Sequence, residues 1–373
     1  MVCCKGVFDH EGSGVCISDV CVNTVNRARR TLIKSLTATA LLAVWSRRAP
    51  PEQTSENNVN LYADDNLAAY GFPDGHPFGI DRQGEFLREV AARGLLDSVT
   101  RPASRAASRA EITRFHSAEY VELVATAAAR GLSTLDGGDT PVFPGMYDTA
   151  AHVVGAALDG LAQVMDGRCR HTMQAIGGLH HAARDHAAGF CVFNDLGVVI
   201  ETLRQVYGVQ RVAYLDIDVH HGDGVFYAFE DDPDLIFADI HQDSNTLYPG
   251  TGRADETGTG EAAGTKLNIE LPPFSGDAAF LRAWERVEAH CRAFAPEFFV
   301  FQCGADGLQG DPLAQLDYTP AVHAHATRRL IALADEFADG RLMAFGGGGY
   351  HRDNLAQAWT NVLAELVTGS EPA

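Results

Sequence analysis

Short apolar segments that run directly into polar or glycine-rich motifs recur through the second half of this chain. Residues on both faces of each segment are apolar, which is typical of strands buried within a parallel sheet. Longer stretches with helical periodicity separate the segments, so the sequence predicts a central sheet covered by helices on both faces. We expect the strands at residues 173–176, 212–217, 235–240, Phe298–Gln302 and Leu342–Phe345.

The polar motifs that follow these five strands are the strongest functional signal in the sequence. They read GGLHHA, DVHHGDG, HQDSN, CGADG and GGGGYH in chain order. The carboxyl ends of parallel strands meet at one edge of a sheet, and open α/β sheets bind their ligands at that edge. The sequence therefore predicts that the five motifs converge on one site.

A further strand and several helices complete the expected domain. Val59–Tyr62 reads as a short strand, and no repeat or low-complexity linker interrupts the chain after it. We therefore expect one domain from residue 58 to residue 373. Helical periodicity is found at residues 82–93, 117–130, 144–165, Asp195–Tyr207, Asp277–Phe294 and 319–339.

Carboxylates and imidazoles gather at the end of the strand expected at residues 212–217. Side chains alternate along a strand, so Asp216, Asp218 and His220 are expected to project to one side. Asp218 and His220 offer oxygen and nitrogen ligands that Zn²⁺ accepts, and Asp306, beyond another strand, is the natural third ligand. Two aspartates and one histidine leave an open coordination position, which is typical of a catalytic zinc site.

Paired histidines at another strand end can supply the base that a zinc site with two carboxylate ligands needs. His180 and His181 follow two glycines, and they face two carboxylates, Asp216 and Asp223, that are not needed as metal ligands. A carboxylate bonded to one ring nitrogen fixes the tautomer and raises the basicity of the other nitrogen. We therefore expect His180 to pair with Asp216 and His181 to pair with Asp223.

Tyr350 ends a run of four glycines. Such a run between a strand and a helix indicates phosphate binding or close approach of a substrate. A phosphate loop usually continues with lysine, serine or threonine, whereas tyrosine and histidine follow here. A phenol beside a metal is a good donor to a developing oxyanion, so Tyr350 is a candidate catalytic residue.

The charge and cysteine content exclude two classes of protein. The chain has 49 acidic and 29 basic side chains and a net charge of −20, which leaves no basic field for direct nucleic-acid binding. Its eight cysteines are not spaced as a disulfide framework, and the four near the N-terminus match no zinc motif. We interpret them as reduced thiols without a catalytic role.

Residues 1–57 differ in composition from the remainder and are excluded from the predicted fold. No acidic residue occurs from residue 20 to 51, where basic side chains flank an apolar segment. The composition leaves two alternatives open, a targeting segment and an added or mis-started extension. The apolar segment is too short to span a bilayer. We expect a cytoplasmic protein without a membrane anchor, with targeting or export left open by this segment.

Taken together, the motifs resemble those of the zinc-dependent histone deacetylase superfamily, including the bacterial acetoin-utilisation and histone deacetylase-like amidohydrolases. They occur in the family's order and span most of residues 60 to 365. The resemblance implies an arginase/deacetylase-like three-layer α/β fold with a central, mostly parallel sheet. The matching segments are IGGLHHA (176–182), GFCVFND (189–195), DIDVHHGDG (216–224), YPGTG (248–252), GAD (304–306), GDP (310–312) and GGGGY (346–350).

The resemblance also implies roles for individual residues. His181 would act as general base and acid beside its electrostatic partner His180, and Tyr350 would polarise the scissile carbonyl. The zinc ligands would be Asp218, His220 and Asp306. Substrate would be bound by Gly189, by the aromatic tunnel walls Phe190 and Tyr248, and at the tunnel rim by Asp139 and Leu313. A structural potassium ion would bind Asp216, the backbone of Asp218 and His220, and the turn at Asp239 and Ile240.

The expected function is hydrolysis of an N-acyl amide, with removal of an acetyl or other short acyl group from acetyl-lysine or a small acetylated amine. One alternative is an acetylpolyamine deacetylase. Another is a non-catalytic module that binds acyl-lysine. An arginase-like hydrolase with two manganese ions is disfavoured, because only one carboxylate, Asp306, stands at its strand end. The sequence leaves a homo-oligomer open.

Overall fold

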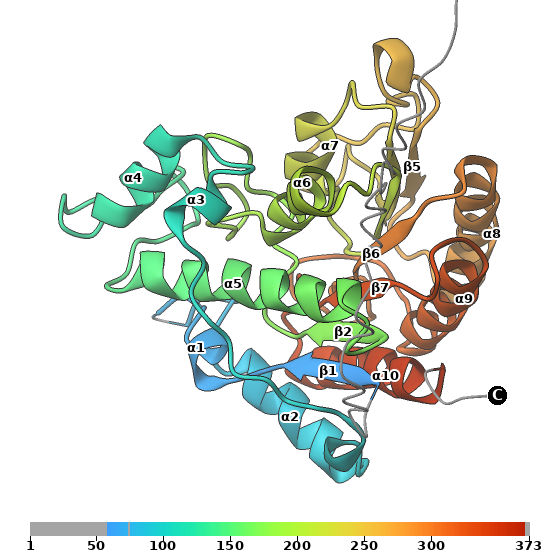
Figure 1. Cartoon of the computed structure of the whole chain (residues 1–373), viewed down its shortest axis with the longest axis horizontal. Coiled ribbons are helices and arrows are strands. Elements are labelled where there is room, and N and C mark those ends of the chain that lie inside the picture. Colours follow the sequence, from blue (N-terminus) through green and yellow to red (C-terminus); the bar gives the residue numbers. More distant parts are fainter. Residues whose placement is uncertain (1–57, 74, 370–373) are drawn as a thin grey trace, which may run out of the picture. The chain divides into compact units, whose positions relative to one another are not determined.

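The computed structural model describes residues 58–369 apart from Asp74. The predicted N-terminal extension at residues 1–57, with its four cysteines, lies outside the described residues. Within them, seven strands form one sheet in which every pairing is parallel, in the order β1-β2-β7-β6-β3-β4-β5 (Figure 1). The strands are β1 Val59–Tyr62, β2 His171–Gln174, β3 Val212–Asp216, β4 Leu235–Gln242, β5 Lys266–Leu271, β6 Phe298–Gln302 and β7 Leu342–Phe345.

The six strands expected from the sequence are all present, and three differ in their bounds. β2 lies two residues earlier than expected, β3 ends at Asp216, and β4 continues to Gln242. β5 was not predicted, because polar residues alternate with apolar ones along its sequence KLNIEL. This strand lies at the edge of the sheet and pairs only with β4, so it does not need apolar residues on every position.

Helices cover both faces of the sheet, as the apolar strands require. Tyr214 and Val300 pack into one core cluster with α5 and α6, whereas Leu215 and Phe301 pack into a second cluster with α2, α8, α9 and α10. The helices are α1 Asp65–Ala68, α2 Arg82–Ala92, α3 Arg109–Ile112, α4 Ala118–Thr126, α5 Met146–Met165, α6 Asp195–Tyr207, α7 Asp223–Ala228, α8 Asp277–Phe294, α9 Ala321–Phe337 and α10 Arg352–Gly369. α1, α3, α7 and α10 were not predicted from the sequence, and the helix expected at residues 117–130 ends at Thr126.

α6 illustrates how local sequence sets the bounds of a helix. The Asn194 side chain accepts a hydrogen bond from the Gly197 amide at 2.9 Å and so caps the first turn. Gly208 ends the helix in the left-handed conformation, with φ of 70°. Gly197 also lets the helix approach Phe115, whose ring would lie 2.5 Å from a Cβ at this position.

The strand order brings together the five motifs singled out in the sequence. β2, β7, β6, β3 and β4 are consecutive in the sheet, and the five polar motifs follow them. Parallel strands present their carboxyl ends at the same edge, so the predicted convergence of the motifs is confirmed.

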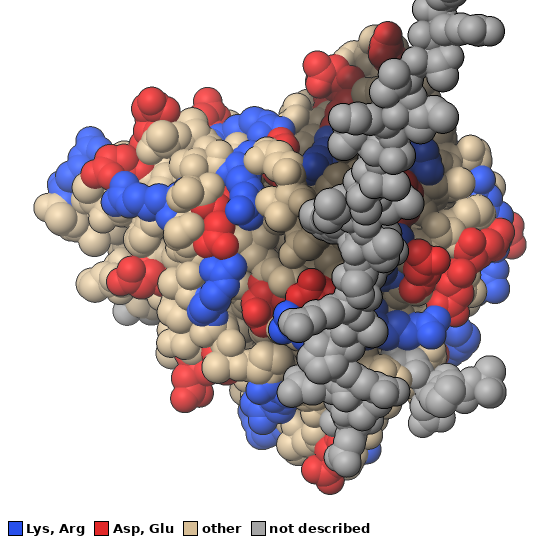
Figure 2. Space-filling view, in the orientation of Figure 1, with Lys and Arg blue, Asp and Glu red and all other residues tan. Residues whose placement is uncertain are grey.

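On the face shown in Figure 2, acidic and basic side chains are interspersed and form no continuous basic field. Among residues 58–369, no helix is long and apolar enough to cross a membrane.

Deleting residues 1–57 is expected to leave the thermal unfolding temperature and the catalytic activity essentially unchanged. β1 begins at Val59, and the carbonyl of Asn58 accepts a hydrogen bond from the Arg170 amide at 2.8 Å, a contact that the truncated chain retains. Thermal unfolding and kinetics of the truncated and full-length proteins test this boundary. A truncated protein that does not fold would show that the domain begins earlier than residue 58.

Candidate active site

The connection after β3 holds the densest group of titratable side chains. The strand ends at Asp216, so the expectation that strand alternation carries all three side chains to one side is wrong beyond that residue. Residues 217–222 form an irregular turn. Asp216 faces His180, with 2.7 Å between its Oδ2 and the His180 Nδ1, whereas Asp218 and His220 face Asp306. The turn therefore divides the side chains between two functional groups.

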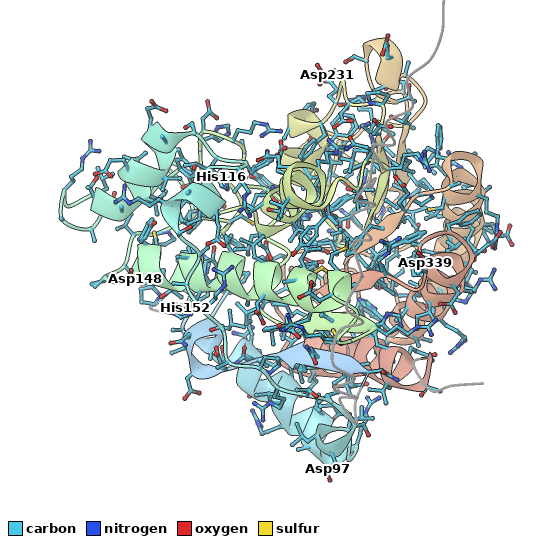
Figure 3. All side chains as sticks on the ribbon, viewed as in Figure 1. Asp97, His116, Asp148, His152, Asp231 and Asp339 are labelled. Carbon is cyan, nitrogen blue, oxygen red and sulfur yellow. The ribbon has the colours of Figure 1, made fainter. Side chains whose placement is uncertain are left out.

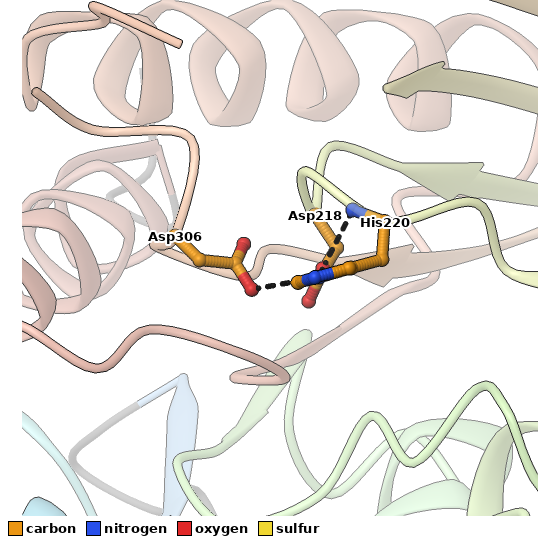
Figure 4. A group of neighbouring side chains, drawn as sticks. All are labelled: Asp218, His220 and Asp306. Atoms are coloured by element: carbon orange, nitrogen blue, oxygen red, sulfur yellow. Dashed lines mark hydrogen bonds and ion pairs between the residues drawn. The ribbon is translucent and has the colours of Figure 1, made fainter. Parts of the chain in front are cut away.

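Asp218, His220 and Asp306 form a compact, buried cluster (Figure 4). His220 Nδ1 lies 3.1 Å from Asp218 Oδ1 and 3.2 Å from Asp306 Oδ2. Burial and the charge of Asp218 raise the pKa of Asp306 to about 6. Burial alone would lower the pKa of His220, but both carboxylates outweigh it and raise that pKa to about 10. Two buried carboxylates so close together require a positive charge beside them to be stable.

The residues fit a zinc ion on two structural grounds. Asp306 Oδ2 receives no hydrogen bond, although Asp306 is fully buried, and so has an unused lone pair directed into the cluster. The backbone also approaches very closely, because a Cβ on Gly304 would lie 2.1 Å from Asp218 Oδ2 and one on Gly348 would lie 2.0 Å from Asp306 Oδ2. Two oxygen donors and one nitrogen donor within 4.8 Å of one another are a ligand set that zinc accepts.

Gln302, the last residue of β6, fixes Asp218 and was not identified from the sequence. Its Nε2 donates to Asp218 Oδ2 at 2.9 Å, and its Oε1 accepts from the Gly304 amide at 2.8 Å. The Gly348 amide donates to the same Asp218 oxygen at 2.8 Å. The sequence feature that could have indicated this role is a glutamine at the end of an otherwise apolar strand. Such groups orient metal ligands.

The two predicted histidine–aspartate pairs are both confirmed. His180 Nδ1 lies 2.7 Å from Asp216 Oδ2, and His181 Nδ1 lies 2.6 Å from Asp223 Oδ1. Asp216 also accepts hydrogen bonds from the Tyr214 hydroxyl and from the Asp218 amide. A carboxylate at Nδ1 favours the tautomer with its proton on that nitrogen, which leaves Nε2 as the basic atom of each ring.

The Nε2 atoms of His180 and His181 are 3.1 Å apart. One additional proton can be shared across this distance, which makes the pair suited to accept and return a proton. Burial and the neighbouring His180 lower the pKa of His181, so its basic form predominates at neutral pH. Burial, Asp239 and Asp218 raise the pKa of Asp216 well above its ordinary value.

The His180–His181 turn is held by Asp195, the last residue of the motif GFCVFND, for which the sequence indicated no separate role. Its two carboxylate oxygens accept hydrogen bonds from the Gly178 amide at 2.9 Å and the Leu179 amide at 2.8 Å. Burial raises the pKa of Asp195 to about 6. Acidic residues are common in the first turn of helices, so nothing in the sequence indicated a role for Asp195 beyond the start of α6.

Tyr350 lines the same pocket as His180, His181, Asp218 and His220. Its amide donates to Asp311 Oδ2 at 2.8 Å, which fixes the backbone after the glycine run. Burial, Asp306 and Asp218 raise the pKa of Tyr350 well above its ordinary value, so the phenol remains a hydrogen-bond donor. The structure therefore brings the phenol, the imidazole pair and two members of the Asp–His–Asp cluster, Asp218 and His220, into the lining of one pocket.

The glycine run itself rests on Arg82, a residue that no sequence signal marked. The guanidinium donates to the Gly347 carbonyl at 2.6 Å and to the Gly349 carbonyl at 3.0 Å. It also stacks over Phe78, with its central carbon 3.9 Å from the ring centroid. Arg82 is fully buried at the start of α2, and burial lowers its pKa to about 10.

The residues expected to bind substrate occupy different depths. Gly189 lines the pocket, and a Cβ there would lie 2.4 Å from the His181 ring. Phe190 packs edge-on to Tyr350 with ring centroids 5.9 Å apart, and the half-exposed Tyr248 packs edge-on to His181 at 5.2 Å.

Of the residues expected to bind substrate, only Gly189 is among those that line this pocket in the described chain, whereas Phe190, Tyr248 and Leu313 are not, and Asp139 is exposed. Leu313 lies two residues after Asp311 and its amide donates to Asp311 Oδ1 at 3.0 Å. The expectation that Leu313 contacts substrate is therefore without direct support from the pocket. Asp97 and Asp231, two acidic residues that are labelled in Figure 3, lie at the periphery of the fold.

The fold and this pocket define an arginase/deacetylase-like α/β protein, and the comparisons identify its family. Residues 76–366 match the model of the histone deacetylase domain. The acetoin utilization protein AcuC of Bacillus subtilis is 36% identical over 309 residues, covering 80% of this chain and 79% of that protein. This chain belongs to the histone deacetylase family, which places it among the deacetylase hydrolases.

Two further relatives extend the similarity. Histone deacetylase 8 of Xenopus tropicalis is 33% identical over 286 residues, covering 74% of this chain and 76% of that protein. The crystal structure of the HDA15 HD domain superposes with a TM-score of 0.76 at 26% identity, covering 86% of this chain and 91% of that one. The predicted fold and family are therefore confirmed.

Proposed function

We propose that the chain is a zinc-dependent amidohydrolase that removes an acetyl or other short acyl group from acetyl-lysine. The observation that carries this proposal is one pocket lined by His181, Tyr350 and two members of the Asp218–His220–Asp306 cluster, Asp218 and His220. Acyl-amide hydrolysis needs these three elements, namely a Lewis acid, a base that activates water, and a donor for the oxyanion. A non-catalytic binding module does not need the paired imidazoles.

Asp218, His220 and Asp306 would hold the zinc ion. A zinc ion bound there supplies Lewis-acid polarisation of the substrate carbonyl and lowers the pKa of water at its open position. His181 accepts the proton of the attacking water on Nε2, because its Nδ1 is already bonded to Asp223. The shared proton between His180 and His181 can then be returned to the leaving amine.

Tyr350 donates its phenolic hydrogen bond to the substrate oxygen as negative charge develops there. Its raised pKa keeps it protonated, and the Asp311 bond to its amide holds the backbone in place. Gly189 leaves room beside His181, while Phe190 and Tyr248 flank the acyl-lysine stem and Asp139 meets the substrate backbone at the rim. In this proposal, the residues that carry out the reaction lie at the floor of the pocket, and the residues that recognise the substrate lie at its mouth.

Turnover of purified, zinc-loaded protein on acetyl-lysine peptides, acetylpolyamines and longer acyl-lysines tests the function. We expect acetyl-lysine peptides to be hydrolysed, with loss of activity after chelation and recovery after zinc is restored. Binding of acyl-lysine without turnover would favour the non-catalytic module. A strong preference for acetylpolyamines would favour the alternative substrate class while leaving the amidohydrolase assignment intact.

Replacing Leu313 with glutamate is expected to narrow the preference between acetyl-lysine and acetylated polyamines. Leucine cannot pair with a second ammonium, so the wild type should prefer acetyl-lysine in kcat/KM by about tenfold, or about 1.4 kcal/mol. Asp139 at the rim and the net charge of −20 limit this preference, because both attract cations. The two specificity constants are measured on wild type and Leu313→Glu, and an unchanged ratio would place Leu313 outside the recognition surface.

Two further expectations accompany this function. We infer a structural potassium ion near Asp216 and Asp239. Asp239 and Ile240 lie within β4 and not in the turn expected from the sequence, and the charge of Asp239 contributes to the raised pKa of Asp216. We also expect the enzyme to act in the cytoplasm on acetylated lysine or small amines, without direct contact to nucleic acid or membrane. Size measurements in solution would establish whether it forms a homo-oligomer.

A further inference from the structure

The short loop that carries Asp139 is tied to Phe190, which follows the pocket residue Gly189, packs edge-on to the pocket residue Tyr350, and is called the aromatic wall. Asp136 closes this loop on itself, because its carboxylate accepts hydrogen bonds from the Gly138 amide at 2.9 Å and from the Thr140 hydroxyl at 2.6 Å. The same Thr140 hydroxyl oxygen accepts a hydrogen bond from the Phe190 amide at 3.2 Å. The Thr140 hydroxyl therefore links the loop to Phe190 through hydrogen bonds.

A second connection passes through His76, which lies in the loop before α2. The Phe78 amide donates to His76 Nδ1 at 3.1 Å, so that nitrogen carries no proton. The proton is then on Nε2, which donates to the Asp139 carbonyl at 3.2 Å. Burial lowers the pKa of His76, which favours this neutral tautomer.

The His76 ring also packs directly against the wall. Its centroid lies 4.6 Å from that of Phe190, edge-on, and 4.7 Å from that of Phe72. Phe190 has a φ of 68°, a left-handed conformation that a non-glycine residue adopts only when its surroundings hold it. His76 is thus half-buried between the pocket wall, the pocket residue Phe78 and the rim loop.

We propose that His76 is a positioning residue that fixes the Asp139 rim loop against the pocket wall and thereby favours acyl-lysine within a peptide over a small acetylated amine. The proposal rests on the deacetylase function proposed above. A peptide backbone reaches the rim, whereas a small amine occupies only the pocket. Holding the rim loop in place before binding lowers the entropic cost of peptide binding and leaves the chemical step at the pocket floor unchanged.

Three substitutions separate the contacts of His76. Glutamine keeps a donor near the position of Nε2, asparagine keeps only an acceptor near Nδ1, and phenylalanine keeps the ring without either hydrogen bond. We expect the KM for an acetyl-lysine peptide to rise about tenfold in His76→Phe and His76→Asn and to stay within about twofold in His76→Gln. The kcat, and the KM for an acetylated small amine, should change by less than about twofold.

His325→Phe is the matched control, since His325 is also a partly buried imidazole beside an aromatic ring, Trp284, but lies outside the pocket. We expect wild-type kinetics from it. An unchanged peptide KM in both His76→Phe and His76→Asn would overturn the proposal. An equal rise in KM for peptide and small amine, or a fall in kcat, would also overturn it, because His76 would then act on the pocket floor.

Hydrogen exchange of the Gly138 and Thr140 amides provides a readout that does not depend on turnover. We expect both amides to exchange several-fold faster in His76→Asn and at the wild-type rate in His76→Gln and His325→Phe. If no acyl amide is turned over by the wild type, the proposed function fails while the exchange result still reports on the loop. Unchanged exchange in a folded His76→Asn variant would contradict the positioning role.

Discussion

Replacing His181 with alanine is expected to lower kcat by roughly 10²–10⁴-fold, the range typical of a lost general base. The expectation rests on the bond between His181 Nδ1 and Asp223, which leaves Nε2 as the basic atom, and on the location of His181 in the pocket beside Asp218 and His220. Zinc content should remain unchanged, because His181 is not one of the three clustered ligands.

A graded variant separates proton transfer from simple disruption of the pocket. Asp223→Asn retains a hydrogen-bond acceptor for His181 Nδ1 but removes the negative charge that supports an imidazolium. We expect it to lower kcat by about 10–100-fold, between wild type and His181→Ala. Steady-state kinetics and metal analysis of both variants check the order. Full activity of a folded, zinc-containing His181→Ala protein would show that another group accepts the proton.

Replacing Tyr350 with phenylalanine is expected to lower kcat by roughly 10²–10³-fold, because one oxyanion donor is lost from a water-poor site. The ring stays in place, since its contact with Phe190 and the bond from its amide to Asp311 do not use the hydroxyl. Folding and zinc content should therefore be preserved.

Tyr147→Phe is a suitable control for Tyr350→Phe, because Tyr147 lies on α5 outside the pocket lining and is only partly buried. Removing its hydroxyl should leave kcat and KM unchanged. Kinetics of the two variants are compared on the same acetyl-lysine peptide. A Tyr350→Phe enzyme as active as wild type would exclude the phenol as the group that polarises the carbonyl.

The sequence was sufficient to predict the fold because the central strands differ sharply from their surroundings. β6 and β7 have the predicted bounds, since each is an apolar run that is followed at once by a polar or glycine-rich motif. β5 was not predicted, because this edge strand contains Lys266 and Asn268 and so is not a continuous apolar run. Lys266 is nevertheless buried, since its ammonium donates to the Asp232 and Leu235 carbonyls.

The sequence predicted the residues that would contact metal or substrate themselves. It did not predict the residues that only hold those residues in position. Asp218, His220 and Asp306 are marked by residue type and by their positions after strands. Gln302 and Arg82 are not, because their roles depend on hydrogen bonds to Asp218 and to the glycine run that only the folded chain brings within reach. The role of Leu313, which rests on the resemblance alone, stays a prediction, because Leu313 is not among the residues that line the pocket.

The bound metal of the purified protein tests the central claim most directly. Protein prepared without added metal should contain about one zinc ion per chain, because three ligands in one cluster make a single site with an open position. Asp306→Asn should lose most of that zinc, whereas Asp339→Asn, which changes an exposed carboxylate far from the pocket lining, should retain it. Two zinc or two manganese ions per chain, or no retained zinc with full activity, would contradict a single catalytic zinc held by Asp218, His220 and Asp306; the inferred potassium ion does not enter this count.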